Sequence, residues 1–163
     1  MSSQSFNLAG READSAIRPV SNPPEILAGR RVGRIQQAIY AAPELAQRLK
    51  TGQAFASADW IGASAVMGYR LLDDWMTKQG LDACCRYRTD SGLAMYAAIR
   101  DGSGAGVLPT YLGDPDPALV RIGDPIPALA SDLWLLIHPD MSGTARIRAV
   151  TDVLANGLRE RLE

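Results

Sequence analysis

Several residue types that carry chemistry are scarce in this chain of 163 residues. It contains one histidine, His138, and two cysteines, Cys84 and Cys85. Adjacent residues on an extended segment point to opposite faces, so the two thiols are poorly placed to share a metal ion or to form a disulfide with each other. We expect both cysteines to be structural, and we expect no bound metal and no cofactor.

The sequence also lacks the motifs of common enzyme classes. No G-x-S-x-G turn, P-loop, paired C-x-x-C or H-E-x-x-H motif occurs. Gly102, Gly104 and Gly106 follow an expected helix instead of opening one, which excludes a dinucleotide fingerprint. Asp73 and Asp74 are neighbours that diverge by about 100° on a helix, as is typical of a solvated face. These absences predict a protein that is not an enzyme.

Charge and hydropathy exclude two further classes. The 17 basic and 18 acidic side chains nearly cancel, and no run of like charge marks a nucleic-acid-binding arm. The longest strongly apolar run, 133–137, is far shorter than the roughly 20 residues that cross a bilayer. The first eight residues have neither the basic region nor the apolar region of a signal peptide. We therefore expect a cytoplasmic protein that has no membrane contact and does not bind DNA by itself.

Hydrophobic residues make up 47% of the chain, enough to build the core of one domain or of two small lobes. Apolar alternation, helical spacing and Gly or Pro breaks predict an α/β order of elements. The expected strands lie at 13–18, 33–42, 60–61, 83–88, 107–108, 119–122 and 132–138, and the expected helices at 43–50, 70–79, 92–100 and from 144 onward.

The segment from 83 to 108 has the clearest pattern: a strand, a helix and a second strand. This order predicts a βαβ unit with a parallel pair of strands and a right-handed crossover. Thr89, Asp90 and Ser91 open its helix, where backbone N–H groups and the helix dipole can bind a carboxylate. The same side chains are also those of an ordinary helix N-cap, and the local sequence leaves both interpretations open.

The last helix carries Ile147, Val150, Leu154, Leu158 and Leu162 at steps of three and four residues, with charged residues between them. Such spacing is typical of an amphipathic helix that packs one face on a sheet. The expected partner is the short apolar strand at 132–138, which is bounded by polar residues and proline and is therefore predicted to be buried.

The stretch from Leu93 to Leu119 resembles the effector-binding domain of LysR-type transcriptional regulators. Ala13–Pro19 (ADSAIRP) is similar to a strand of the family's first lobe, and Arg31–Arg34 to the entry of a crossing strand. Asp132–Asp140 (DLWLLIHPD) is similar to the return strand, and the helix from Thr144 to the family's terminal helix. The order and spacing of these pieces agree over nearly the whole chain.

The resemblance implies an α/β fold of two lobes, like that of periplasmic solute-binding proteins, with the lobes joined by two crossing strands. Lobe one would comprise 1–40 and 131–163, and lobe two 41–130. Full-length family members begin with a winged helix-turn-helix and the first strand and helix of lobe one, which have no counterpart here. An incomplete first lobe is therefore expected, with an open sheet edge that favours self-association. DNA would be bound only through a helix-turn-helix domain absent from this chain.

The resemblance also implies a small-molecule effector, held in the cleft between the lobes, as the partner of this chain. A carboxylic acid suits the helix N-terminus at Thr89–Ser91. The positions expected to face the ligand are Arg18 and Pro19, then Thr89, Asp90 and Ser91, and finally a loop formed by Gly106, Val107 and Leu108.

Two other functions were weighed against that of an effector-sensing domain. A solute-binding module of the same fold with no regulatory role would require secretion, for which the sequence carries no signal. A small enzyme would have to use Asp90, Ser91 or His138, and no nucleophile and base are paired in the sequence.

Overall fold

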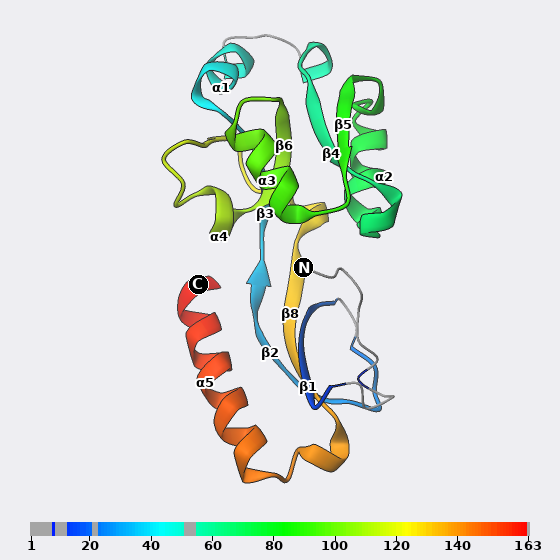
Figure 1. Cartoon of the computed structure of the whole chain (residues 1–163), viewed down its shortest axis with the longest axis vertical. Coiled ribbons are helices and arrows are strands. Elements are labelled where there is room, and N and C mark those ends of the chain that lie inside the picture. Colours follow the sequence, from blue (N-terminus) through cyan, green and yellow to red (C-terminus); the bar gives the residue numbers. More distant parts are fainter. Residues whose placement is uncertain (1–7, 9–12, 21–22, 51–54, 163) are drawn as a thin grey trace. The chain divides into compact units, whose positions relative to one another are not determined.

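The computed structural model describes residues 8, 13–20, 23–50 and 55–162. The chain divides into two compact units (Figure 1): unit 1 is Met1–Ile35 with Ala130–Glu163, and unit 2 is Gln36–Leu129. The mixed α/β class expected from the sequence is confirmed. The units divide at 35/36 and 129/130, whereas the lobe boundaries were expected at 40/41 and 130/131; those lobe boundaries stay a prediction.

Unit 1 contains an antiparallel sheet with strand order β1-β8-β2. Its strands are β1 (Ser15–Pro19), β8 (Ser131–Ile137) and β2 (Ala28–Ile35). The central strand is the most apolar segment of the sequence, and Leu133, Leu135 and Leu136 on it are buried. Successive residues of a strand point to opposite faces, so the buried neighbours Leu135 and Leu136 show that β8 buries apolar side chains on both faces of the sheet, which explains the continuous apolar run.

Helix α5 (Ala145–Leu162) packs against β2 and closes a small core of Val32, Leu133, Leu135 and Ala155. The approach is close at Gly33, where an added Cβ would lie 2.7 Å from Leu162 Cδ1. The apolar strand expected at 132–138 and the helix expected from 144 onward are both confirmed, as β8 and α5.

The face that α5 buries agrees with the expected one at Ile147, Leu158 and Leu162 but differs from it at Val150 and Leu154. The buried line runs through Ile147, Thr151 and Ala155, whereas Val150 is 50% exposed and Leu154 is 38% exposed. The line includes the small residues Thr151 and Ala155, which fit against the sheet and do not stand out in an apolar pattern. The expectation that Val150 and Leu154 pack on the sheet was wrong.

Unit 2 is built on a five-stranded sheet with strand order β5-β4-β6-β3-β7. Strand β4 is parallel to both β5 and β6, and β3 is antiparallel to β6 and β7. The strands are β3 (Gln37–Ala41), β4 (Trp60–Ala63), β5 (Cys85–Thr89), β6 (Ala105–Pro109) and β7 (Val120–Ile122).

Two expectations about strands need correction. The βαβ unit predicted β5 and β6 as a pair, but β4 lies between them and pairs with both. All four residues of β4 are buried, so this short strand occupies the centre of the sheet. The single strand expected at 33–42 is two strands, because β2 ends at Ile35 in unit 1 and β3 begins at Gln37 in unit 2.

The helices of unit 2 were predicted well from local signals. Those predicted are α1 (Pro43–Lys50), α2 (Arg70–Lys78) and α3 (Gly92–Arg100), whereas the short α4 (Thr110–Gly113) was not predicted. Helix α1 begins with proline at its first position, and Gly80 follows α2 with a φ of 70°. Short 3₁₀ turns occur at 55–57, 65–67, 82–84, 127–129 and 139–141.

Helices α1, α2 and α3 all contact strands of this sheet, and α3 approaches β6 most closely at Gly106. An added Cβ at Gly106 would lie 2.5 Å from Ile99 Cδ1, so a larger residue would push α3 away. This contact packs the last turn of α3 against β6.

Candidate functional site

Polar groups gather where the parallel strands of unit 2 end. Strands β4, β5 and β6 run in the same direction, so their carboxyl ends meet at one end of the sheet. Strand β3 is antiparallel and begins there, with Gln37 opposite Pro109. In open α/β sheets, ligands bind at the carboxyl ends of the strands. We call this region the carboxyl-end site: Gln37, Ser64, Tyr69, Thr89, Asp90 and Ser91.

The turn between β5 and α3 is organised by its own hydroxyl groups. Thr89 is 6% exposed, and its Oγ1 accepts a hydrogen bond from the Ser91 N–H at 3.2 Å. Ser91 is the N-cap of α3, because its Oγ accepts from the Ala94 N–H at 3.4 Å. The N-cap interpretation of this turn is confirmed, and the ligand interpretation stays a prediction. Asp90, between them, is exposed.

Ser64 follows β4 and belongs to the same end of the sheet. Its N–H donates to the Thr89 carbonyl oxygen at 2.8 Å, which links the two strand ends. Its Oγ is buried and has no hydrogen-bond partner within the part of the chain that the structure describes. An unpaired buried hydroxyl costs about 1–3 kcal/mol, so such an atom at this end of the sheet is notable. Ser64 was not predicted, because a serine after a strand is no signal by itself.

Gln37 and Tyr69 form a second polar pair of the carboxyl-end site. The Gln37 side-chain amide donates to the Tyr69 hydroxyl, and Gln37 is only 6% exposed. Burial raises the pKa of Tyr69 to about 12, so the phenol stays neutral near pH 7. The two residues are 32 positions apart in sequence, which explains why no local pattern predicted the pair.

Arg88 lies next to this site, but its charge is engaged. The guanidinium donates to the Ala63 carbonyl oxygen at 3.0 Å, to Asp73 Oδ1 at 3.1 Å and to Asp82 Oδ1 at 2.8 Å. These bonds tie β5 to the end of β4 and to α2. The groups that remain for a ligand at the carboxyl-end site are therefore mainly neutral hydroxyl, amide and backbone groups, beside the Asp90 carboxylate.

Residues 107–108 were expected to form a strand of the βαβ unit and also, with Gly106, a loop that faces the ligand; the strand is confirmed and the loop is wrong. These residues lie in β6, where Val107 is 3% and Leu108 is 1% exposed. Strand β6 is paired with β4 on one side and β3 on the other, and Gly106 lies beneath Ile99. Their assignment as ligand-binding residues stays a prediction.

The remaining predicted positions lie in unit 1. Arg18 and Pro19 are on β1, opposite Trp134 and Leu133 of β8. The structure thus brings Thr89, Asp90 and Ser91 together in one turn of unit 2 and places Arg18 and Pro19 in the other unit. The role of Arg18 and Pro19 in binding stays a prediction.

The scarce residue types have local structural roles. His138 is the N-cap of the 3₁₀ turn at 139–141, with its Nδ1 accepting from the Asp140 N–H at 3.3 Å. Cys84 and Cys85 are free thiols, and burial is the main reason that the pKa of Cys85 is raised.

Across the described residues, no group of three or more His, Cys, Asp or Glu side chains is placed so that it could hold a metal ion. No helix among them is long and apolar enough to cross a membrane.

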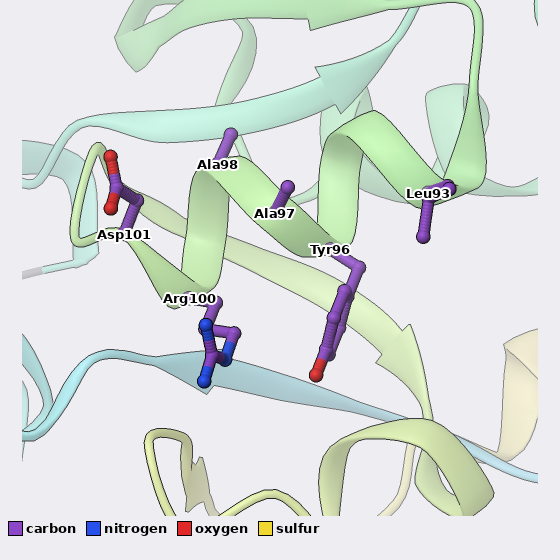
Figure 2. Close-up of a pocket in the computed structure, with 6 residues that line it drawn as sticks. All are labelled: Leu93, Tyr96, Ala97, Ala98, Arg100 and Asp101. Atoms are coloured by element: carbon purple, nitrogen blue, oxygen red, sulfur yellow. The ribbon is translucent and has the colours of Figure 1, made fainter.

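A separate hollow of about 390 Å³ lies along α3 (Figure 2). Tyr96 and Arg100 lie on the same side of this helix (Figure 2), and both bind Asp116. The hydrogen bond from Tyr96 is the main reason that the pKa of Asp116 lies below its ordinary value. These polar groups are therefore engaged in holding the Asp116 segment. The hollow is lined by Leu93, Tyr96, Ala97, Ala98, Arg100 and Asp101.

A family model described as the LysR substrate binding domain matches residues 2–159. This chain belongs to the LysR substrate-binding domain family. The resemblance noted in the sequence is therefore confirmed over nearly its whole length.

Solved structures of LysR-type regulators share the fold. Full-length LysG from Corynebacterium glutamicum with bound effector arginine matches with a TM-score of 0.68 and 17% identity, over 94% of this chain and 53% of that one. The CrgA regulatory domain from Neisseria meningitidis matches with a TM-score of 0.68 and 21% identity, over 97% and 79% of the two chains. The AmpR effector domain of Pseudomonas aeruginosa matches with a TM-score of 0.69 and 18% identity, over 99% and 81%.

These matches confirm the two-lobed fold of periplasmic-binding-protein type that was expected from the sequence. At identities of 17–21% these structural matches establish the fold alone. The chain spans about half the length of full-length LysG and about four fifths of the two regulatory domains. No curated protein sequence matches the chain.

Proposed function

We propose that this chain is the effector-binding part of a LysR-type transcriptional regulator, acts in the cytoplasm and binds a small organic ligand at the carboxyl-end site of unit 2. The supporting observation is the group of neutral hydrogen-bonding side chains, including the unpaired Ser64 hydroxyl, beside the start of α3. The proposal includes no catalytic step.

The start of α3 supplies donors for a carboxylate. The first N–H groups of a helix have no intrahelical acceptor, and the Ser91 cap engages only that of Ala94. The N–H groups of Gly92 and Leu93 are left for water or a ligand. The helix dipole adds a partial positive charge at the same point.

The exposed Asp90 carboxylate narrows the class of ligand. A ligand with several negative charges would be repelled by Asp90, and the Arg88 charge cannot offset this because Asp73 and Asp82 hold it. A molecule that carries one carboxylate together with an ammonium or neutral polar group suits the site better. We therefore propose a zwitterionic or monocarboxylate effector.

The proposed mechanism is a shift of population between two arrangements of the lobes. A ligand changes such an equilibrium only if it binds one arrangement more tightly than the other. Binding in the cleft between the lobes is part of this proposal, and it is supported by the family's architecture alone. Contact with DNA would need a helix-turn-helix domain in addition to the residues of this chain.

The test is a thermal-shift screen of the chain, followed by calorimetric titration, with arginine, other amino acids and monocarboxylic acids as probes. A probe that binds should raise the melting temperature in a concentration-dependent way. In the double variant Thr89→Ala/Ser91→Ala the shift should disappear, because the two hydroxyls hold the turn that presents the N–H groups of Gly92 and Leu93. The lost cap should lower stability by only about 1–2 kcal/mol.

The matched control is Ser142→Ala, which removes a hydroxyl that donates to the Pro139 carbonyl oxygen at 2.6 Å in unit 1. This variant should keep the shift of any probe that binds. Equal binding by the control and by the double variant would contradict the site assignment, and no shift with any probe would contradict the proposed ligand class.

A further inference from the structure

The turn that follows Ser64 is apolar and exposed. It is the 3₁₀ turn Ala65–Met67 between β4 and α2, and the residues from 65 to 68 (AVMG) carry no charged, hydroxyl or amide side chain. Val66 is 78% exposed, the largest exposed fraction among the large apolar side chains that the structure describes. Single exposed apolar residues are common on protein surfaces, so the meaning of Val66 depends on what lies beside it.

This turn contacts the start of α3, where the proposed carboxylate donors lie. Met67 is packed against the core of unit 2, and its Cε lies 3.6 Å from the position that a Cβ on Gly92 would take. Gly92 is the first residue of α3, and its N–H is one of the two donors left for a carboxylate. The apolar turn and these donors are therefore neighbours.

Ser64 joins the apolar turn to the polar groups of the carboxyl-end site. It occupies the N-cap position of the turn, where a serine ordinarily caps through its hydroxyl. The Ser64 side chain makes no capping hydrogen bond, and its Oγ is buried without a partner among the described residues. One short segment thus offers both a hydrogen-bonding group and an apolar surface.

The charges around the site decide which side group a ligand can carry. The exposed Asp90 carboxylate suits the ammonium group of a zwitterion whose carboxylate lies at the start of α3. The turn Ala65–Met67 has no side chain that could pair with a further charged group, so such a group would lose water there without gaining a partner. An aliphatic group would instead gain free energy by covering Val66.

We propose that the turn Ala65–Met67 receives the side group of the effector and that this side group is apolar. The inference rests on the proposed function, because it places the carboxylate of the ligand at the start of α3. The effector class is then a monocarboxylate, with or without an ammonium group, that carries a branched aliphatic side group. Leucine and isocaproate represent this class, and alanine and propionate are their counterparts with little apolar surface.

The first test is calorimetric titration of the full chain with these four probes and with arginine. The larger member of a pair should bind about tenfold or more tightly than the smaller one, because each methylene group in an apolar site is worth about that factor. Arginine, with its charged side group, should bind more weakly than leucine.

The variant Val66→Asn should remove most of this preference. The affinity for leucine or isocaproate should fall about tenfold, whereas that for alanine or propionate should change by less than about twofold. The matched control is Val153→Asn, because Val153 is 73% exposed and lies in unit 1. This control should keep the preference, and circular dichroism of both variants checks that the fold is retained.

The outcomes separate this inference from the proposed function. Probes that bind, and that lose binding in Thr89→Ala/Ser91→Ala, but show no preference for the larger member would overturn the inference and leave the proposed function standing. A preference that is unchanged in Val66→Asn would do the same. No binding of any probe would overturn both.

A second measurement locates the side group directly. Nuclear Overhauser effects are expected between the methyl groups of bound leucine or isocaproate and those of Val66 and Met67. The Val66 methyl signals are assigned by their loss in Val66→Asn. Overhauser effects to methyl groups of unit 1 alone would overturn the inference.

Discussion

The two units of this chain differ in the size of the core that each builds. Unit 2 has a five-stranded sheet contacted by α1, α2 and α3, and its core includes the fully buried Trp60 and Tyr40. Unit 1, over the residues described, has a three-stranded sheet with α5 on β2 and a core cluster of four buried residues. A site on unit 2 is therefore supported by the larger core, whereas the small core of unit 1 depends on the packing of one helix against its sheet.

The largest expected effect compares the same substitution in the two cores. Leu72 in α2 is 0% exposed and Leu135 in β8 is 1% exposed. Replacing either by alanine should cost about 3 kcal/mol, because both leave a cavity. Native-state hydrogen exchange should show faster opening of unit 2 amides in Leu72→Ala and of unit 1 amides in Leu135→Ala. Equal acceleration of exchange in both units by either variant would mean that the two units open together, which would contradict two separate cores.

Low pH should destabilise unit 2 by protonating Asp116. The hydrogen bond from Tyr96, and then that from the Ala118 N–H, hold the pKa of Asp116 below its ordinary 3.8. A carboxylate with a depressed pKa stabilises the fold above pH 3.8, and this contribution is lost as the pH falls through the folded-state value. Asp116→Asn should therefore show a smaller fall in melting temperature between pH 7 and pH 3 than the unchanged chain. An equal fall in both would contradict this assignment.

High pH should destabilise unit 2 by deprotonating Tyr69. Its pKa is raised by burial from 10.0 to about 12, so the folded state holds the proton more tightly than the unfolded state. The contribution is complete below pH 10 and is lost as the pH rises toward 12. Tyr69→Phe should lose less stability over this range, as measured by denaturant titration at pH 9 and pH 11. A variant as sensitive to alkali as the unchanged chain would exclude Tyr69 as the source.

The smallest effect is expected at the surface of unit 1. Arg30 and Asp152 form an ion pair of 3.0 Å between β2 and α5, with side chains 40% and 64% exposed. Exposed pairs contribute about 0–1 kcal/mol, so Asp152→Asn should change the unfolding free energy by less than about 0.5 kcal/mol in moderate salt. A loss several times larger would show that the attachment of α5 depends on charge more than on the apolar core of unit 1.

The sequence predicted those features that depend on neighbouring residues. Helices α1 and α3 were predicted with their observed bounds, because Pro43 and the Ser91 cap mark their starts locally. The place of β4 between β5 and β6 was not predicted, since strand pairing depends on residues far apart in the chain. The buried face of α5 was predicted correctly at Ile147, Leu158 and Leu162. Between them it was misassigned, because Thr151 and Ala155 are buried there instead of Val150 and Leu154.

The candidate site was predicted only in part, because some of its residues are brought together from distant parts of the chain. The turn Thr89–Ser91 follows from local helix-capping chemistry. Ser64 reaches it through the pairing of β4 with β5, and Gln37 meets Tyr69 across 32 positions. The strand at 107–108 was predicted, but its pairing with β4 and β3 was not, because these partners lie far away in the sequence; this pairing rules out the loop expected at Gly106–Leu108.

The most direct test of the proposed function is a nuclear magnetic resonance titration of the chain with arginine and monocarboxylic acids, following the backbone amides. Binding should produce concentration-dependent shifts at Ser64, Ser91, Gly92 and Leu93, and these shifts should be lost in Thr89→Ala/Ser91→Ala. Shifts that leave these amides unchanged and arise elsewhere, or that persist in the double variant, would contradict a ligand site at the carboxyl end of the unit 2 sheet.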